Sequence, residues 1–449
     1  MKAKNVRTRF APSPTGFIHI GSVYSTMLDY AFAKKHKGQF VLRIEDTDRK
    51  RYVSGSEEKI YQALNWFGFS PDENYRQSER LSIYKKYAEE LVKKNYAYYC
   101  FCSPERLREL REEQKKKKQP SRYDRHCRSL NKKEVEKKLA KREKYVIRMK
   151  IPDDEKIIVN DLIRGKITFD SNLIDDQVLL KSDGFPTYHL AVVVDDHLMK
   201  ISHIIRGEEW LSSTPKHVLL YRYFGWQMPV LLHTPILRNP DRSKMSKRRK
   251  HTSLDWYREQ GFLPEALLNF LALLGWSHPE EKEIFPFDEF IKFFDLKDVN
   301  PIGPVFDLTK LEWMNGVYIR NKPDSELAEL LRPFLPKMSK KQILAAVPLI
   351  KERIKKLSEA KELLEFVWRR LDYPFNLLLQ RNLRKRRAKE MLEKTKEIVE
   401  KTEIEKTELL RQRLMDLVKR NSWNVGAFFM VLRVAICGKK ITPPIVESL

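Results

Sequence analysis

Short apolar runs alternate with helix-like segments over the first hundred residues of the chain. Val6 to Ala11 and Gln39 to Glu45 are short and mostly apolar, which is typical of buried strands. From Val23 to Phe32 and from Ser56 to Phe67, apolar side chains recur at the spacing of one helix face. This alternation predicts an α/β fold in which helices cover both faces of a parallel sheet.

The pattern changes at residue 100. Shorter strands are expected at Tyr145 to Lys150, Lys156 to Asp161 and Lys166 to Phe169. The stretch from Glu105 to Lys150 contains 19 basic and 8 acidic residues, a local charge of +11. Residues 100 to about 187 are therefore expected to form a small α+β domain inserted between two halves of the sheet domain. A charged surface subdomain without a partner is the alternative.

The sheet is expected to resume from Gly184 to His197. Further short strands are predicted at Ile204–Ile205 and from Val230 to His233, with a helix from Thr214 to Tyr223 between them. Helical spacing begins again at Ser253, and everything after about residue 320 has the pattern of helices only. The later amphipathic segments begin at Ser325, Ser339, Leu357, Arg387 and Glu405.

The net charge of the chain indicates what kind of partner it binds. The chain has 87 basic and 61 acidic residues, a formal charge of +26, which favours a polyanion and nucleic acid before a membrane surface. No apolar run is long enough to cross a bilayer, and the N-terminus has no apolar signal core. A cytoplasmic protein with no membrane association is expected.

One stretch near the start joins a strand to a helix by a tight turn. Pro12-Ser-Pro-Thr-Gly16 cannot continue the strand, because two prolines and a glycine break its hydrogen bonding. His19-Ile-Gly-Ser22 then begins a helix, whose free N–H groups and positive dipole end attract an anion. Gly21 lets a ligand approach the backbone, and His19 can donate to a phosphate oxygen. An ordinary turn with a surface histidine is the alternative.

A basic loop follows more than 200 residues later, at Ser243-Lys-Met-Ser-Lys-Arg-Arg249. It can place Lys244 and Lys247 on a polyphosphate, or it can be a solvated surface loop. Together, in this order, the two stretches resemble the HIGH and KMSKS signatures of class I aminoacyl-tRNA synthetases. With Arg9-Phe-Ala-Pro-Ser-Pro-Thr-Gly16 before the first signature, the chain resembles bacterial-type glutamyl-tRNA synthetases over residues 5 to about 445.

This resemblance implies an architecture. A Rossmann-type parallel-sheet catalytic domain carries an inserted connective domain for the acceptor end of tRNA, and an all-helical anticodon-binding region follows. The implied boundaries are 1–99 and 188–252 for the catalytic halves, 100–187 for the insertion, 253–320 for a helical stem-contact domain and 321–449 for the anticodon domain. A monomer is expected, and a typical member has a further short helical segment beyond the end of this chain.

The resemblance also implies a two-step reaction of L-glutamate, ATP and tRNA(Glu), with Mg²⁺ offsetting the polyphosphate charge. The alternative is a form that also charges tRNA(Gln) with glutamate. Trp210 is expected to flank the adenine or to be a core residue. The implied catalytic residues are His19, Gly21, Lys244 and Lys247. The implied ATP contacts are Pro12, Ser13, His19, Gly21, Ser22, Trp210, Lys244, Met245, Ser246, Lys247 and Arg248.

Glutamate carries two carboxylates and an ammonium, so its pocket needs guanidinium groups and an anion. Arg9 and Arg206 can pair with carboxylates, and Glu45 can bind the ammonium or serve as a structural carboxylate. Val192 stands where the family often has Asn, which removes an amide from the pocket. The glutamate contacts implied by the resemblance are Arg9, Ala11, Ser13, Glu45, Tyr188 and Arg206.

Three of the four cysteines lie close together in the sequence. Cys100-Phe-Cys102 with Cys127 resembles a structural zinc site that some members carry, in which a fourth ligand completes a tetrahedron. The family's His two residues after the third Cys is Ser here, so Tyr123 or His126 is the expected fourth ligand of Zn²⁺. Three reduced thiols in an apolar subdomain are the alternative.

Three related classes of protein fit less well. Glutaminyl-tRNA synthetases resemble Pro-Glu-Pro-Asn-Gly where this chain has Pro12-Ser-Pro-Thr-Gly16. The short relative that glutamylates a modified tRNA base lacks an anticodon region, whereas a long helical segment follows residue 320 here. A non-catalytic nucleotide- or tRNA-binding relative would need a damaged signature, and His19, Gly21, Lys244 and Lys247 are all intact.

Overall fold

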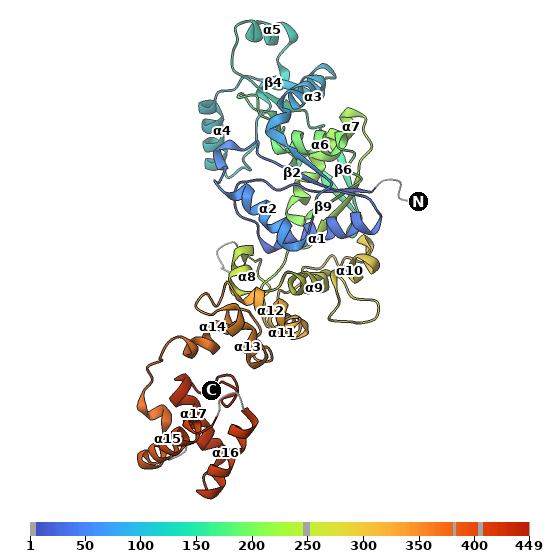
Figure 1. The fold of residues 1–449 in the computed structure, drawn as a ribbon. Coiled ribbons are helices and arrows are strands. Elements are labelled where there is room, and N and C mark those ends of the chain that lie inside the picture. The colour runs from blue at the N-terminus through green and yellow to red at the C-terminus, as the bar shows by residue number, and fades with distance from the viewer. Residues whose placement is uncertain (1–5, 246–251, 380–382, 403–406, 449) are drawn as a thin grey trace. The chain divides into compact units, whose positions relative to one another are not determined.

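The computed structural model describes residues 6–245, 252–379, 383–402 and 407–448 (Figure 1). These residues form two compact units. The first contains the chain up to Leu254 together with Leu268–Asp307, and the second contains Asp255–Leu267 and the chain from Leu308 onward. The five-part division expected from the sequence is finer than this one and stays a prediction.

The first unit is built on two sheets of largely parallel strands. One sheet has the order β1-β2-β3, and all its strands are parallel. They are β1 (Arg7–Phe10), β2 (Gln39–Ile44) and β3 (Glu73–Arg76). The observed β1 and β2 lie within the strands predicted from the apolar runs.

The second sheet has the order β7-β6-β10-β9, with β7 antiparallel at one edge. Its strands are β6 (Lys156–Asp161), β7 (Gly165–Asp170), β9 (His203–Gly207) and β10 (Val230–Thr234). The two sheets meet between β1 and β9, where the backbone N–H of Ser202 donates to the carbonyl oxygen of Arg7 at 2.9 Å. The carboxyl ends of β1 and β9 therefore lie side by side.

Helices cover both sides of these strands, with α1 on one side and α7 on the other in Figure 1. The helix α1 buries Val23, Met27 and Leu28 because these residues share the face that packs on β1, β2 and β9. The helices of the first unit outside the insertion include α1 (Ile20–Lys35), α2 (Ser56–Phe67), α3 (Leu81–Lys93), α6 (Tyr188–Leu198), α7 (Thr214–Phe224) and α10 (Phe287–Phe293). The expected α/β architecture is confirmed.

The segment Gly184 to His197 was predicted to resume the sheet, but from Tyr188 onward it forms helix α6 instead. Its run of valines favours a strand when the sequence is considered alone. In the structure, every residue from Leu190 to Asp196 is buried. Such a helix has no polar face, so the spacing that normally identifies a helix is missing from this segment.

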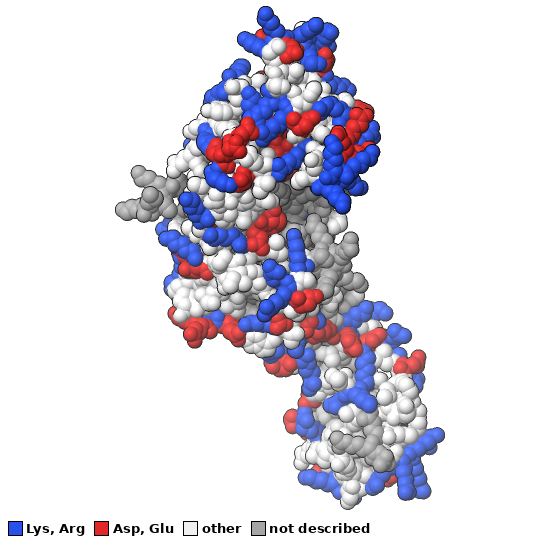
Figure 2. All heavy atoms as spheres, turned by 180° about the vertical axis from the view of Figure 1, so that it is seen from behind, with Lys and Arg blue, Asp and Glu red and all other residues white. Residues whose placement is uncertain are grey.

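The inserted part contains a three-stranded antiparallel sheet in the order β4-β5-β8. Its elements are β4 (Ala97–Cys100), α4 (Pro104–Lys116), α5 (Lys132–Ala140), β5 (Val146–Met149) and β8 (Val178–Leu180). Lys and Arg side chains crowd the part of the first unit that carries α5 (Figure 2). The sequence assigned β6 and β7 to this insertion, but β6 pairs with β10, so both strands belong to the second sheet.

The second unit is helical, and it contains no strand among its described residues. Two separate hydrophobic cores hold it, one with Leu327, Val347 and Ile354, and one with Leu414, Phe428 and Leu432. Its helices are α8 (Leu254–Gln260), the start of α9 (Pro264–Gly275), α11 (Leu308–Asn321), α12 (Asp324–Leu331), α13 (Lys340–Ile350), α14 (Glu359–Leu364), α15 (Lys385–Glu400), α16 (Thr407–Arg420) and α17 (Val425–Cys437). The expected helical C-terminal region is thus confirmed.

None of the helices in the described ranges is both long and apolar enough to cross a membrane.

Gly38 allows the chain to pass tightly from α1 into β2. A Cβ at this position would lie 2.2 Å from the carbonyl oxygen of Val6, which also accepts the N–H of Gln39. We expect Gly38→Ala to destabilise the first unit by about 1–3 kcal/mol, because the added atom overpacks against backbone. Thermal unfolding followed by calorimetry measures this as a lower midpoint. Gly16→Ala is the control, since nothing lies within 4 Å of its added Cβ; equal midpoints for the two variants would contradict the prediction.

Candidate active site

A cavity of about 1320 Å³ lies within the first unit. It is bordered by the ends of β1, β2, β9 and β10 and by the first turn of α1, which is where parallel α/β sheets bind ligands. The sequence-predicted residues that line it are Arg9, Ala11, Pro12, Ser13, His19, Gly21, Ser22, Glu45, Tyr188, Arg206, Trp210, Lys244 and Met245. The structure thus brings together residues from both signatures.

One end of the cavity is formed by the start of α1. His19 is the N-cap, and its Nδ1 accepts the backbone N–H of Ser22 at 3.2 Å. The first turn of α1 contains no acidic residue, so nothing there opposes the positive end of the helix dipole. A Cβ at Gly21 would meet the His19 ring at 3.2 Å. Glycine therefore keeps this wall of the cavity open beside the imidazole.

The basic loop borders the cavity through Lys244 and Met245. Two hydrogen bonds hold the first residues of this loop. The side-chain amide of Asn239 donates to the hydroxyl of Ser243 at 2.9 Å, and the N–H of Met245 donates to the carbonyl oxygen of Leu237 at 3.2 Å. The predicted contacts Ser246, Lys247 and Arg248 lie outside the described residues.

Buried charged side chains lie behind the part of the cavity that Arg9 and Glu45 line. Asp196 on α6 accepts from two arginines, Arg9 Nε at 3.2 Å and Arg43 Nη1 at 2.7 Å. Arg43 also donates to Glu45 at 3.0 Å and has no exposed surface. These pairs fix the positions of the β1 and β2 side chains that face the cavity.

Burial raises the pKa of Glu45 to about 7, although the charge of Arg43 opposes this shift. Glu45 forms an ion pair with Arg43, which agrees with the predicted alternative of a structural carboxylate, and it also lines the cavity. A carboxylate with a pKa near neutrality changes its charge within the physiological pH range.

Arg206, at the end of β9, is held by neutral groups. Its Nη1 donates to the hydroxyl of Tyr188 at 3.1 Å, and its Nη2 donates to the hydroxyl of Thr214 at 2.9 Å. His233 and His217 lie against the same guanidinium, at 3.1 Å and 3.3 Å. The side chain is fixed by four neighbours and still faces the cavity.

Trp210 is a wall of the cavity. The alternative of a core residue is wrong, because the residue is 37% exposed. The centroid of its ring lies 4.4 Å from that of Tyr188. Val192 also lines the cavity and is itself almost fully buried. This stretch of wall is therefore apolar, which suits a ligand's flat or aliphatic part.

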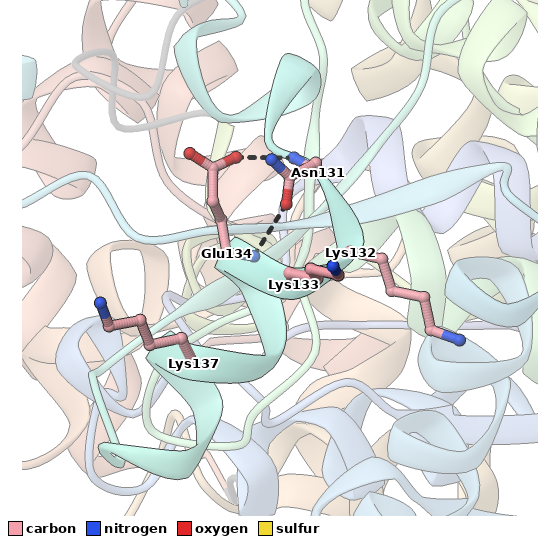
Figure 3. A pocket seen from close by; sticks show the side chains of 5 residues that line it. All are labelled: Asn131, Lys132, Lys133, Glu134 and Lys137. Atoms are coloured by element: carbon pink, nitrogen blue, oxygen red, sulfur yellow. Dashed lines mark hydrogen bonds between the residues drawn. The ribbon is translucent and has the colours of Figure 1, made fainter.

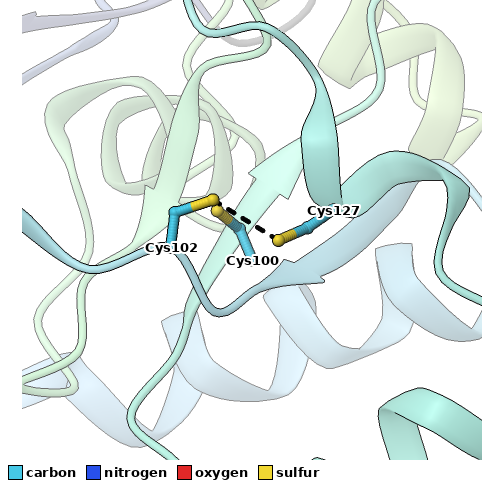
Figure 4. A group of neighbouring side chains, drawn as sticks. All are labelled: Cys100, Cys102 and Cys127. Atoms are coloured by element: carbon cyan, nitrogen blue, oxygen red, sulfur yellow. Dashed lines mark hydrogen bonds between the residues drawn. The ribbon is translucent and has the colours of Figure 1, made fainter. Parts of the chain in front are cut away.

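The three clustered cysteines come together in the inserted part (Figure 4). Their Sγ atoms lie within 4.8 Å of one another, and the hydroxyl of Tyr123 lies 3.3 Å from Cys100 Sγ and 3.4 Å from Cys102 Sγ. A hydrogen bond from Cys127 lowers the pKa of Cys100 to about 4, which favours the thiolate that metals bind. The side chain of His126 is exposed and is not part of this group. Tyr123 therefore fits better as a fourth ligand.

A second, shallow hollow of about 450 Å³ lies at the start of α5 (Figure 3). Asn131 and Glu134 form a capping box there, because each side chain accepts the other residue's backbone N–H. Lys132, Lys133 and Lys137 surround it. The helix start is already capped, so this hollow adds positive charge to the surface but no built site.

Sequence reasoning missed the residues that support the cavity from behind. Arg43 and Asp196 hold Arg9 and Glu45, and His233 and Asp161 lie behind Arg206. A signal existed for the second pair, because Asp161 and His233 were each predicted as the last residue of a strand. The carboxyl ends of neighbouring parallel strands meet at one edge. No sequence signal points to the partners of Arg43.

The class of protein follows from this fold and site together with two family matches. Residues 5–313 match the family of class I tRNA synthetases (E and Q), catalytic domain, and residues 326–449 match an anticodon binding domain. The chain therefore carries the catalytic domain of a class I tRNA synthetase, and most of the matched residues belong to the first unit.

Comparison with individual relatives shows which family within this class the chain belongs to. A glutamate–tRNA ligase of Acidothermus cellulolyticus is 47% identical over 473 residues, which cover 99% of this chain and 92% of the relative. One of Thermus thermophilus is 46% identical and covers 99% and 96%. A crystal structure of a glutamate tRNA ligase from Elizabethkingia meningosepticum in complex with its amino acid has a TM-score of 0.89 at 37% identity and covers 99% and 96%. The chain belongs to the glutamate–tRNA ligase family.

Proposed function

We propose that this chain activates L-glutamate with ATP and transfers the glutamyl group to the 3′-terminal adenosine of tRNA(Glu). The observation that supports this best is one cavity lined by two chemically different groups of residues. A helix start and Lys244 suit a polyphosphate, and buried arginines with a carboxylate suit an amino acid.

In the first step, a carboxylate oxygen of glutamate attacks the α-phosphorus of ATP, and pyrophosphate leaves. Such chemistry needs positioning and charge neutralisation more than a proton donor. His19, the backbone at Gly21, Lys244 and Lys247 are the residues we assign to the phosphates. Bound Mg²⁺ would add positive charge beside the same oxygens. Pro12, Ser13, Ser22, Met245, Ser246 and Arg248 complete the proposed ATP contacts, with Trp210 beside the adenine.

The amino acid occupies the part of the cavity with the fixed charges. Arg9 and Arg206 bind the two carboxylates, and Glu45 binds the ammonium, in the arrangement proposed here. Tyr188 holds Arg206 through its hydroxyl. Ala11 and Ser13 border the same space. In the second step, the terminal hydroxyl of tRNA takes the glutamyl group, and AMP is released.

The basic insertion, residues 100–187, is proposed to hold the acceptor end of tRNA, with 253–320 on its stem and 321–449 on its anticodon. The excess of Lys and Arg around α5 supports the first assignment, because phosphate contacts need cations (Figure 2). We further propose a cytoplasmic monomer. Nothing in the described residues favours the alternative that tRNA(Gln) is also charged.

Charging of purified tRNA with labelled L-glutamate tests the main proposal. We expect the protein to charge tRNA(Glu) with ATP and Mg²⁺ present and to leave tRNA(Gln) uncharged. Lys247→Ala is expected to lower kcat/KM for ATP on the order of 10²–10³-fold, because one stabilising charge is lost from the transition state. Lys85→Ala is the matched control, since this exposed lysine pairs with Glu89 on α3.

Absence of charging on both tRNAs by the intact protein would overturn this function. If both tRNAs are charged, the proposal that only tRNA(Glu) is a substrate is overturned, and the alternative that tRNA(Gln) is also charged is supported.

The pKa of Glu45 predicts how glutamate binding depends on pH. The carboxylate that binds the ammonium is ionised above pH 7 and becomes protonated below it. We therefore expect KM for glutamate to rise as the pH falls from 8 to 6, by up to about tenfold per unit below the pKa. Burial holds the pKa of His189 at about 3, so this neighbour of the pocket does not titrate in that range.

Initial rates of charging over this pH range give KM at each pH. Glu45→Gln cannot ionise, and its KM is expected to be high and independent of pH. The same slope in Glu45→Gln as in the wild-type protein would assign the titration to another group.

The cysteine group is proposed to bind a structural Zn²⁺ through Cys100, Cys102, Cys127 and Tyr123. We expect about one zinc per chain by elemental analysis, lost in Cys127→Ser and held less tightly against a chelator in Tyr123→Phe. Cys437→Ser is the control, because this buried thiol lies outside the group. His126→Asn is also expected to retain zinc. Protein purified with zinc present that contains none would contradict the site.

A further inference from the structure

Arg206 differs from the other buried arginines beside the cavity. Arg9 pairs with Asp196 at 3.2 Å, and Arg43 pairs with Asp196 at 2.7 Å and with Glu45 at 3.0 Å. Arg206 is only 7% exposed and forms no ion pair with a carboxylate in the part of the chain that the structure describes. A guanidinium taken out of water without a counter-charge is costly, so its surroundings need an explanation.

The surroundings satisfy its N–H groups without cancelling its charge. The Nε–H donates to His233 Nε2 at 3.1 Å, and the other three contacts are the hydroxyls of Tyr188 and Thr214 and the Nδ1 of His217. All four acceptors are neutral groups. The orientation of the guanidinium is therefore fixed while its positive charge remains available to a ligand.

Asp161 determines which nitrogen of His233 can accept. Its Oδ2 lies 2.7 Å from His233 Nδ1 and also accepts the backbone N–H of His233 at 2.9 Å. The proton of the neutral imidazole therefore lies on Nδ1, and the lone pair on Nε2 faces Arg206. The other oxygen of Asp161 accepts the N–H groups of Ile163 and Arg164 in the β6–β7 turn, at 3.2 Å and 3.1 Å. The hydrogen bonds therefore run without a break from this turn, through Asp161 and His233, to Arg206.

A second histidine chain lies on the other side of Arg206. His217 Nδ1 accepts from Arg206, which leaves the proton on Nε2, and Nε2 lies 3.1 Å from His189 Nδ1. Burial lowers the pKa of His217 well below its usual value and that of His189 to about 3. Both rings therefore stay uncharged near neutral pH and do not repel the guanidinium.

We propose that Asp161 and His233 are positioning residues that hold Arg206 as an unpaired cation for a carboxylate of the amino-acid substrate. The bound carboxylate supplies the direct ion-pair partner that Arg206 lacks among the described residues. This inference deepens the proposed function and rests on it, because it assumes that the substrate is an acidic amino acid in this cavity.

Two substitutions of His233 separate positioning from simple packing. His233→Asn can still donate to Asp161 but is too short to accept from Arg206. His233→Gln can place its amide oxygen near the Nε2 position. We expect His233→Asn to raise KM for glutamate about tenfold or more and to leave kcat and KM for ATP nearly unchanged. The reason is that Arg206 would bind the glutamate carboxylate less well in the ground state and in the transition state alike. His233→Gln is expected to recover most of this loss.

His278→Asn is the matched control, because His278 is also buried and lies 3.1 Å from a carboxylate, that of Glu289, but does not line the cavity. Charging of tRNA(Glu) with varied glutamate gives the kinetic constants, and calorimetric titration of each protein with L-glutamate gives the affinity without tRNA.

A KM for glutamate within twofold of wild type in His233→Asn would overturn the proposal. Equal losses in both His233 variants, with KM for ATP and the melting temperature changed together, would show a packing role and would also overturn it. If the wild-type protein charges no tRNA, the proposed function fails, and the glutamate titrations then decide this inference separately: binding weakened in His233→Asn supports it, whereas no binding by the wild-type protein overturns it.

Discussion

The arrangement of the active site depends on one buried carboxylate, Asp196, which accepts from two arginines on neighbouring strands. Arg43 is wholly enclosed, so its charge is compatible with folding because Asp196, Glu45 and, at 3.9 Å, Asp195 lie beside it. Removal of one partner from such a group leaves a buried charge without compensation, at a cost of about 3–5 kcal/mol. The helix α6 and the strands β1 and β2 are therefore locked together at the part of the cavity proposed for the amino acid.

The neighbouring residue extends this lock to the outer helix layer. Asp195 accepts from Arg80 at 2.9 Å and from the hydroxyl of Tyr84 at 2.7 Å, and both partners lie next to or on α3. Two successive carboxylates at the end of α6 thus point to different parts of the first unit. Their buried pairing explains why a helix with so few polar residues has a defined rotation about its axis.

Local patterns predicted the elements well where one face of an element is exposed. The helix α2 begins and ends at the predicted residues because its apolar residues alternate with exposed ones at helical spacing. The same reasoning failed for α6, which is buried on all sides and rich in valine. Helical periodicity is visible only when one face of a helix is apolar and the other is polar. A helix that is enclosed by other elements is apolar on most sides, so its periodicity cannot be seen in the sequence.

The candidate site was predictable to a similar extent. Both signatures and Arg206 were visible in the sequence, and the structure gathers their described residues around one cavity. The supporting contacts were not visible, because His233 and Asp161 are 72 residues apart and meet only through the pairing of β10 with β6. The basic composition of the insertion led to β6 being assigned there, which separated Asp161 from the site.

The charge on Arg206 bears on how a carboxylate is distinguished from an amide. Val192 lines the cavity and offers no side-chain hydrogen bond to a ligand. Among the described contacts of Arg206, every acceptor is neutral. A ligand carboxylate would form an ion pair with this guanidinium, whereas a ligand amide would offer it no negative charge. The hydrogen bonds behind Arg206 therefore fix the direction of a positive charge that favours a carboxylate over an amide.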